Sequence, residues 1–166
     1  MAAQESRSRP ITACVVTVSD GVSRGDREDA SGDVAEAMVQ DVVDNVQRAI
    51  VPDEMKEIEN RLRELIARGT DLVLTTGGTG FGPRDVTPEA TKQVVDREAP
   101  GLAELMRAAG YRKTPMAALS RAIAGSAGST LIVNLPGSPK AVKESLEVIL
   151  EVIPHALELL RGRTRH

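Results

Sequence analysis

The stretch VLTTGGTGFGPRDVTPEAT, residues 73–91, decides the fold. It begins with an apolar run, continues through a loop with four glycines, and enters a segment in which Thr87 can cap a helix and Pro88 can occupy its first position. A buried strand that leads through a glycine-rich loop into a helix is typical of an α/β sheet, where ligands bind at the carboxyl ends of the strands.

The segments before this stretch repeat the alternation of strand and helix. Residues 11–18, ITACVVTV, are rich in β-branched side chains and apolar on both faces, which predicts a strand covered on each side. A helical stripe around residues 34–43, a strand at 46–51 and a helix that stops at Gly69 follow, and residues 72–75 form the third strand. The order predicts right-handed crossovers and a mostly parallel central sheet between two helical layers, a three-layer sandwich.

The segments after the glycine-rich loop complete the domain. Residues 87–96 and 101–109 are predicted to be helical. Residues 117–135 contain two short apolar segments around a Gly-Ser turn, which we expect to form a short antiparallel strand pair. A last helical stripe runs to Pro154, where the ring of proline should kink or end the helix.

Length and composition limit the class of protein. A chain of 166 residues with 41% apolar residues suits one domain, here residues 11–160, with flexible tails at 1–10 and 161–166. The net charge of −3 and the presence of only two aromatic residues, Phe81 and Tyr111, argue against nucleic acid as a partner. The single cysteine, Cys14, is predicted to be a buried thiol. Without a long apolar run or a signal-peptide pattern, the sequence predicts a cytoplasmic protein with no membrane partner.

Four polar loops follow predicted strands, at residues 19–32, 52–54, 75–85 and 134–140. In parallel sheets such loops meet at one edge and can build a single pocket. The glycines at positions 77, 78, 80 and 82 allow successive amides to turn inward, so the third loop is predicted to hold a phosphate or to approach a flat ring. Glycine-rich turns also occur for architectural reasons, and this loop matches neither the P-loop nor the dinucleotide motif.

Two carboxylates are the candidate metal ligands. Asp85 stands beside the predicted phosphate cradle, where a negative charge is unfavourable unless a cation lies between, and Asp53 offers a second carboxylate from the neighbouring loop. Mg²⁺ held by one or two carboxylates and by phosphate oxygens resolves this conflict. The alternatives are that Asp53 caps a helix, that Asp85 is an ordinary loop acid, and that Asp20 closes a turn after the first strand.

Two further segments are candidate contacts for a ligand. Ser138 can cap the last helix, whose first amides and Lys140 would also attract an anion. Ser120 and Arg121 stand at the start of a predicted strand, where Arg121 can be either an ion-pair partner or a ligand contact. The two histidines, His155 and His166, have no neighbours that suggest a triad or a zinc site.

Taken in order, SDGVSRGDREDASG, VPDE, TTGGTGFGPRDVTPEAT, LSRA and NLPGSPKAVKE resemble the MoaB/Mog family of molybdenum-cofactor biosynthesis proteins, which is similar to the G domain of plant and animal cofactor-insertion proteins. The resemblance implies an α/β fold, a homotrimer, and Mg²⁺-dependent adenylylation of molybdopterin by ATP with release of pyrophosphate. It implies that Asp53 and Asp85 are the critical acids, with metal binding as their task. It places substrate or nucleotide contacts at Ser19, Asp20, Gly21, Thr76, Gly77, Gly78, Thr79, Gly80, Ser120, Arg121, Pro136, Gly137, Ser138 and Lys140.

Two rival functions remain open at this point. Some proteins of the resembled family keep the fold without catalysis, so this chain can also be a molybdopterin-binding or scaffold protein. A different nucleotide-binding α/β protein would bind ATP without regard to pterin. The resemblance also implies a transient contact with the downstream molybdenum-insertion protein.

Overall fold

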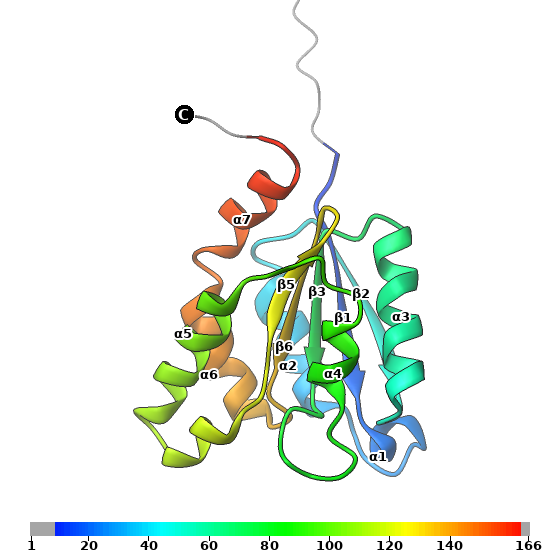
Figure 1. Ribbon diagram of the computed structural model, residues 1–166, viewed down its shortest axis with the longest axis vertical. Coiled ribbons are helices and arrows are strands. Elements are labelled where there is room, and N and C mark those ends of the chain that lie inside the picture. The colour runs from blue at the N-terminus through cyan, green and yellow to red at the C-terminus, as the bar shows by residue number, and fades with distance from the viewer. Residues whose placement is uncertain (1–8, 164–166) are drawn as a thin grey trace, which may run out of the picture.

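The computed structural model describes residues 9–163, which form one six-stranded sheet between helices (Figure 1). The strands stand in the order β2-β1-β3-β6-β5-β4; β2, β1, β3 and β6 are parallel, and β5 is antiparallel to β6 and to β4. The predicted α/β fold, with a mostly parallel sheet and an antiparallel pair, is confirmed. The strand bounds are β1 Thr12–Val18, β2 Asn45–Val51, β3 Leu72–Thr76, β4 Arg97–Glu98, β5 Ala124–Ala127 and β6 Thr130–Leu135.

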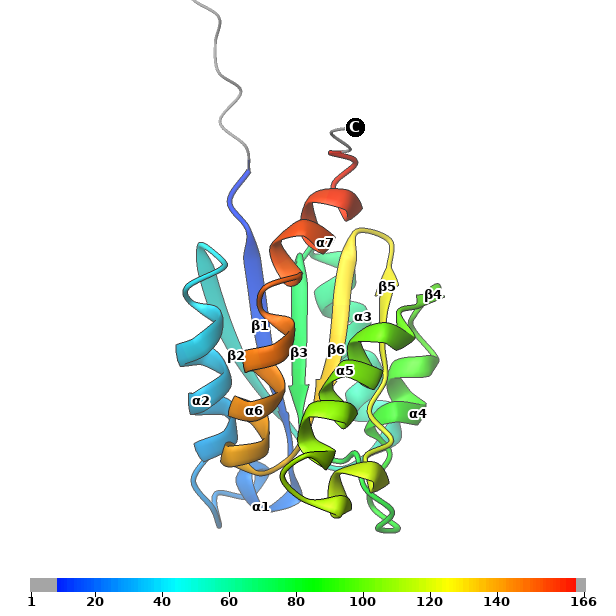
Figure 2. The same ribbon diagram turned by 90° about the vertical axis from the view of Figure 1, so that its left-hand side faces the viewer.

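The helices cover both faces of the sheet, which gives the predicted three layers (Figure 2). One face packs against α2 (Ala30–Val39), α5 (Pro100–Tyr111), α6 (Pro139–Ile149) and α7 (Ile153–Leu160). The other face packs against α3 (Met55–Ala67) and α4 (Thr87–Lys92). Two short helices, α1 (Asp20–Ser23) and the 3₁₀ helix η1 (Pro115–Leu119), belong to connecting segments.

Strand β1 shows why the central strands are apolar on both faces. Ala13 and Val15 pack into the core beneath α2 and α6, while Cys14, Val16 and Val18 pack into the core beneath α3. Successive side chains of a strand point to opposite faces, so a strand between two helical layers must be apolar at nearly every position. Cys14 is buried as predicted, and burial, which outweighs the charge of Arg61, raises the pKa of its thiol to about 11.

Helix ends follow local signals in the sequence. The side chain of Asp29 caps α2 by accepting from the amide of Gly32, and Gly69, with φ of +75°, follows the end of α3. The last helical stripe ends earlier than predicted: α6 stops at Ile149, and Pro154 lies in the first turn of a separate helix, α7.

Three local predictions were wrong. Residues 117–121 do not begin a strand, because η1 occupies residues 115–119 and β5 starts only at residue 124, so Ser120 and Arg121 lie in the connecting segment. Thr87 is not the cap of α4; its hydroxyl donates to the carbonyl of Gly77 at 2.9 Å. The helix predicted over residues 87–96 ends at Lys92, and strand β4 follows between the two predicted helices.

A buried ion-pair cluster joins the two ends of the described chain, at the amino edge of the sheet. Asp71 is 1% exposed and accepts from Arg161 at 2.8 and 3.0 Å, from Arg9 at 2.7 Å, and from the amide of Thr12 at 2.9 Å. Arg161 also donates to the carbonyls of Arg9 and Pro10. Arg9, Pro10 and Arg161, placed in the predicted tails, thus make defined contacts, while residues 1–8 and 164–166 lie outside the described residues.

The helices of residues 9–163 are all too short or too polar to cross a lipid bilayer.

Candidate functional site

The loops that follow β1, β2, β3 and β6 meet at the carboxyl edge of the sheet, at the bottom of Figure 1. There they enclose a cavity of about 460 Å³, here called the polar cavity. Its walls come from all four loops and from the start of α2. The lining residues are Thr17, Val18, Ser19, Val22, Arg27, Glu28, Ala30, Ser31, Asp53, Thr76, Gly77, Gly78, Asp85, Gly137, Ser138 and Pro139.

The segment of residues 76–85, here called the glycine loop, requires glycine at two positions. Gly77 and Gly78 have φ of +89° and +69°, and an added Cβ would stand 2.4 Å from the carbonyl oxygen of Val18 and 2.2 Å from the hydroxyl of Thr87, respectively. Within residues 9–163, the amides of Gly78, Thr79 and Gly80 donate to no acceptor. Consecutive unpaired amides in such a turn form a site for an anion.

Asp53 and Asp20 lock the loops after β1 and β2 to each other. The amide of Asp20 donates to Oδ2 of Asp53 at 2.9 Å, and the amide of Asp53 donates to Oδ1 of Asp20 at 3.0 Å. Asp53 therefore does not cap α3, whose N-cap residue, Glu54, makes no capping hydrogen bond with its side chain. The reciprocal pair fixes the direction of both side chains before any ligand binds.

Arg84 joins a third loop, the glycine loop, to these two loops. Its guanidinium donates to both carboxylate oxygens of Asp20, at 3.0 and 3.1 Å, and to Glu54 at 3.1 Å. The hydrogen bonds from Arg84 hold the pKa of Asp20 below its ordinary value. Asp20 is thus already neutralised by a cation, whereas Asp53 and Asp85 have no such partner among the described residues.

Asp53 and Asp85 both line the polar cavity and each keeps one free oxygen. Oδ2 of Asp85 accepts from the amide of Gly82 at 2.9 Å, but in residues 9–163 no donor reaches Oδ1 of either acid. Burial, together with the charges of Asp20 and Asp85, raises the pKa of Asp53. The cavity therefore holds two carboxylates that form no ion pair within residues 9–163, beside the unpaired amide of Gly78, an arrangement suited to a cation that bridges to an anionic ligand.

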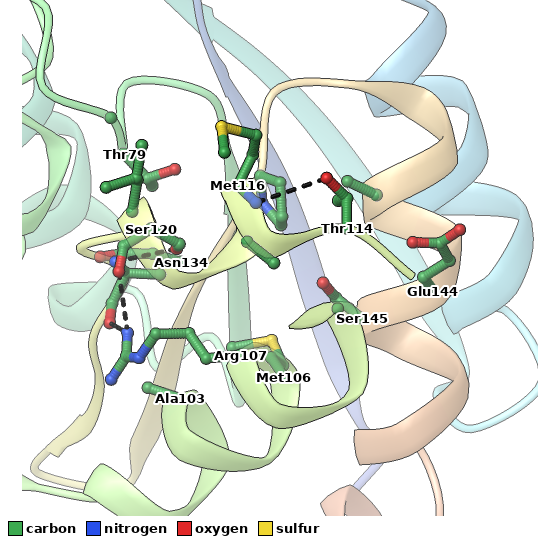
Figure 3. A pocket seen from close by; sticks show the side chains of 17 residues that line it. Thr79, Ala103, Met106, Arg107, Thr114, Met116, Ser120, Asn134, Glu144 and Ser145 are labelled. Carbon is green, nitrogen blue, oxygen red and sulfur yellow. Dashed lines mark hydrogen bonds between the residues drawn. The ribbon is translucent and has the colours of Figure 1, made fainter. Parts of the chain in front are cut away.

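A second cavity, of about 290 Å³, lies on the other side of the glycine loop and is here called the apolar cavity (Figure 3). Thr79 and Gly80 of the loop line it, beside Met106 and Arg107 of α5 and Met116 of η1. Figure 3 also places Asn134 there; its side-chain amide donates to the hydroxyls of Thr75 and Thr91. A cavity with apolar walls and few polar groups suits a flat organic ring.

The predicted site residues divide between the two cavities. Ser19, Asp53, Thr76, Gly77, Gly78, Asp85, Gly137 and Ser138 line the polar cavity, and Thr79, Gly80, Ser120 and Pro136 line the apolar one. Ser138 also caps α6, which confirms one of its two predicted roles. Asp20, Gly21, Arg121 and Lys140 line neither cavity.

Sequence reasoning missed several lining residues. Arg27, Glu28 and Ser31 reach the polar cavity from the long loop after β1 and the start of α2. The capping pattern at Asp29 could have placed Ser31 at a helix start, at the same sheet edge as Asp53. Arg107 lies within a helical stripe, and no pattern in the sequence marks it as a cavity residue.

Known proteins resemble this chain along most of its length. Residues 14–155 match the family model described as "Probable molybdopterin binding domain". The chain is 41% identical over 152 residues to molybdopterin adenylyltransferase of Helicobacter pylori strain J99, covering 89% of this chain and 86% of that protein. It is 45% identical over 153 residues to the molybdenum cofactor synthesis protein cinnamon of Drosophila melanogaster, covering 90% of this chain but 26% of cinnamon.

Solved structures agree with these matches. The crystal structure of the molybdopterin biosynthesis enzyme MoaB from Thermus thermophilus superposes with a TM-score of 0.84 at 52% identity, covering 92% of this chain and 97% of that one. The resemblance to the MoaB/Mog proteins is therefore confirmed, and the chain belongs to the molybdopterin-binding-domain family of molybdenum cofactor biosynthesis.

Proposed function

We propose that this protein transfers the adenylyl group of ATP to molybdopterin, with Mg²⁺, and releases pyrophosphate. The observation that carries the proposal is the polar cavity, where the glycine loop, with the unpaired amide of Gly78, stands beside two carboxylates with free oxygens. The adenylyltransferase that is 41% identical to this chain supports the same reaction. The chain is accordingly proposed to be a nucleotidyltransferase.

The donor set fits Mg²⁺ bound together with a substrate. Within residues 9–163 no group of three or more His, Cys, Asp or Glu side chains could hold a metal ion by itself. Mg²⁺ commonly binds through one or two carboxylates and completes its shell with water and substrate phosphates. Asp53 and Asp85 would hold the ion through their free oxygens, and the ion would neutralise charge on the reacting phosphates.

The residues of this chain would act mainly by aligning the two substrates. The nucleophile is a phosphate oxygen of molybdopterin, which is already anionic, so no general base is needed to activate it. The amides of Gly78, Thr79 and Gly80 would hold a phosphate at the boundary of the two cavities. The polar cavity would take the nucleotide and the apolar cavity the pterin ring, so that both substrates meet across the glycine loop.

The nucleotide half of the proposal is tested by calorimetry of MgATP binding. The parent protein is expected to bind ATP more tightly with Mg²⁺ than without it. The variant Asp53→Asn is expected to lose at least about 10-fold in affinity for MgATP while binding metal-free ATP at least as tightly as the parent, because the change removes the metal contact and also the repulsion between this carboxylate and the phosphates. Asp96→Asn is the matched control, since Asp96 accepts a backbone amide, that of Gly128 at 2.7 Å, in a turn away from both cavities.

A parent protein that binds no nucleotide with or without Mg²⁺ contradicts the adenylyltransferase proposal. Binding of molybdopterin without turnover of MgATP would instead favour the non-catalytic alternative. A homotrimer, a cytoplasmic location and a transient contact with a downstream insertion protein are further proposals that rest on the family.

A further inference from the structure

Arg121 is fully occupied by contacts to the glycine loop and its surroundings. Its Nε donates to the carbonyl of Gly80 at 2.7 Å, and its Nη2 donates to the carbonyl of Asp85 at 2.8 Å. Its own amide donates to the carbonyl of Thr79 at 2.9 Å. The remaining guanidinium nitrogen, Nη1, forms an ion pair with Glu89 of α4. One residue thus holds the loop at three carbonyls.

The part of the loop that Arg121 spans, residues 79–85, has one other side-chain anchor to a neighbouring loop, Arg84, which donates to Asp20 and Glu54. Phe81, between the two bonded carbonyls, is 73% exposed, and the guanidinium of Arg121 lies 5.5 Å from the centroid of its ring. The bonds between Gly82 and Asp85, at 2.9 and 3.0 Å, keep the turn closed on itself but do not fix it to the sheet. Arg84 fixes the turn to the loops after β1 and β2, whereas Arg121 fixes it to the segment before β5, on the side of the apolar cavity.

Arg121 is itself attached to the rigid layers. Arg107 of α5 donates through Nη1 to the carbonyls of Ser120 and Ala122, at 3.3 and 2.8 Å, on either side of Arg121 (Figure 3). The amide of Ile123 donates to the side chain of Asn134, which is fully buried in β6. Arg121 thus reaches the loop from a segment anchored to a helix and to the centre of the sheet.

We propose that Arg121 is a positioning residue of the adenylyl transfer. It holds Asp85 and the unpaired amides of the glycine loop in place relative to the sheet, without touching substrate. Its three guanidinium nitrogens all have protein partners, and it lines neither cavity. The proposal rests on the proposed function for its kinetic part only, because loop order can be measured without any substrate.

The test compares Arg121→Lys and Arg121→Met with the parent. A positioning role predicts that kcat falls by about 100-fold in both variants with little change in the KM for MgATP, because a shift of about 1 Å in a reacting group has an effect of this size. A lysine cannot bond two carbonyls in the geometry of the guanidinium fork, so Arg121→Lys should recover little of the kcat that Arg121→Met loses. A residue that binds a phosphate directly would behave differently, with a raised KM in Arg121→Met that Arg121→Lys largely restores.

Hydrogen exchange measured by mass spectrometry supplies the readout that needs no activity. Peptides covering residues 81–87 are expected to exchange at least about 10-fold faster in both Arg121 variants, because their hydrogen-bonded amides, those of Gly82, Asp85 and Thr87, lose protection when the turn is released. Peptides of β1 and β3 should keep the protection of the parent. Arg63→Met is the matched control, because Arg63 also donates to a backbone carbonyl, that of Gln93, but from α3 and away from the loop.

Unchanged exchange of residues 81–87 in folded Arg121→Met overturns the positioning role, as does a rise in KM with kcat intact. Faster exchange of these residues in both variants, in a parent that shows no adenylyl transfer, would support the structural role while contradicting the proposed function. The two inferences can thus fail separately.

Discussion

Asp85→Asn is expected to lower the rate of pyrophosphate release from MgATP and molybdopterin by about 100-fold or more, since it removes a charge that faces the reacting phosphates. The fold should survive. Asparagine keeps an oxygen that can accept from the amide of Gly82, the bond that Oδ2 of Asp85 makes at 2.9 Å. The thermal midpoint of the variant should therefore stay close to that of the parent.

The control is Asp96→Asn, another exchange of a carboxylate that accepts a backbone amide in a turn. It is expected to keep the parent's rate of pyrophosphate release. If folded Asp85→Asn also keeps that rate, Asp85 does not hold the metal and the account of the polar cavity is wrong.

Asp71→Asn is expected to give the largest loss of stability, about 3–5 kcal/mol in the free energy of unfolding, because it leaves the guanidinium groups of Arg161 and Arg9 without their anion. Asp71 is 1% exposed and the side chain of Arg161 is 11% exposed, so solvent cannot replace the contact between these two. The cluster lies at the amino edge of the sheet, opposite both cavities, so MgATP affinity should not change where the variant is folded.

The pH dependence of this loss has a definite sign. Burial raises the pKa of Asp71, but hydrogen bonds from Arg161 and from the amide of Thr12 outweigh it, and the pKa lies below the ordinary value of 3.8. The folded state thus favours the ionised form, whose contribution is complete above 3.8 and is lost as the pH falls through the folded pKa.

Urea unfolding at a series of pH values measures this contribution. The difference between parent and Asp71→Asn should be full at neutral pH and shrink below pH 3.8. A difference under about 1 kcal/mol at neutral pH, the size typical of exposed pairs, would mean that the cluster behaves like a surface ion pair.

The central sheet could be predicted because the composition of each central strand reflects its burial. Residues 13–18 of β1 and residues 72–76 of β3 are buried throughout. A run that is apolar on both faces is typical of a strand that helices cover on both sides. Once the strands were predicted to be parallel, their carboxyl ends had to share an edge, and this placed Asp53 and Asp85 together.

The start of β5 could not be predicted from the sequence, and the reason is physical. Strand β5, with the sequence AGSA, has no β-branched residue, and its start is set by bonds to its neighbours rather than by propensity. Asn134 of β6 accepts the amide of Ile123, one residue before β5, a contact that joins positions 11 residues apart. The apolar segment 117–119 belongs to η1 instead, and this places Ser120 and Arg121 outside the strand.

Within the site, glycines and acids were predictable but their partners were not. Gly77 and Gly78 indicated a special backbone, whereas the reciprocal bonds of Asp20 and Asp53 and the bonds of Arg84 and Arg121 join separate loops. A long flexible arginine leaves no local pattern that shows which carbonyl or carboxylate it reaches.

The most direct measurement of the proposed reaction is the mass of the pterin product. Purified parent protein would be incubated with molybdopterin, MgATP and pyrophosphatase, and the pterin fraction analysed by mass spectrometry. The proposed reaction yields adenylylated molybdopterin, formed only when Mg²⁺ is present. A folded protein that binds both molybdopterin and MgATP yet forms no adenylylated product would contradict it, and would leave the glycine loop as a binding surface alone.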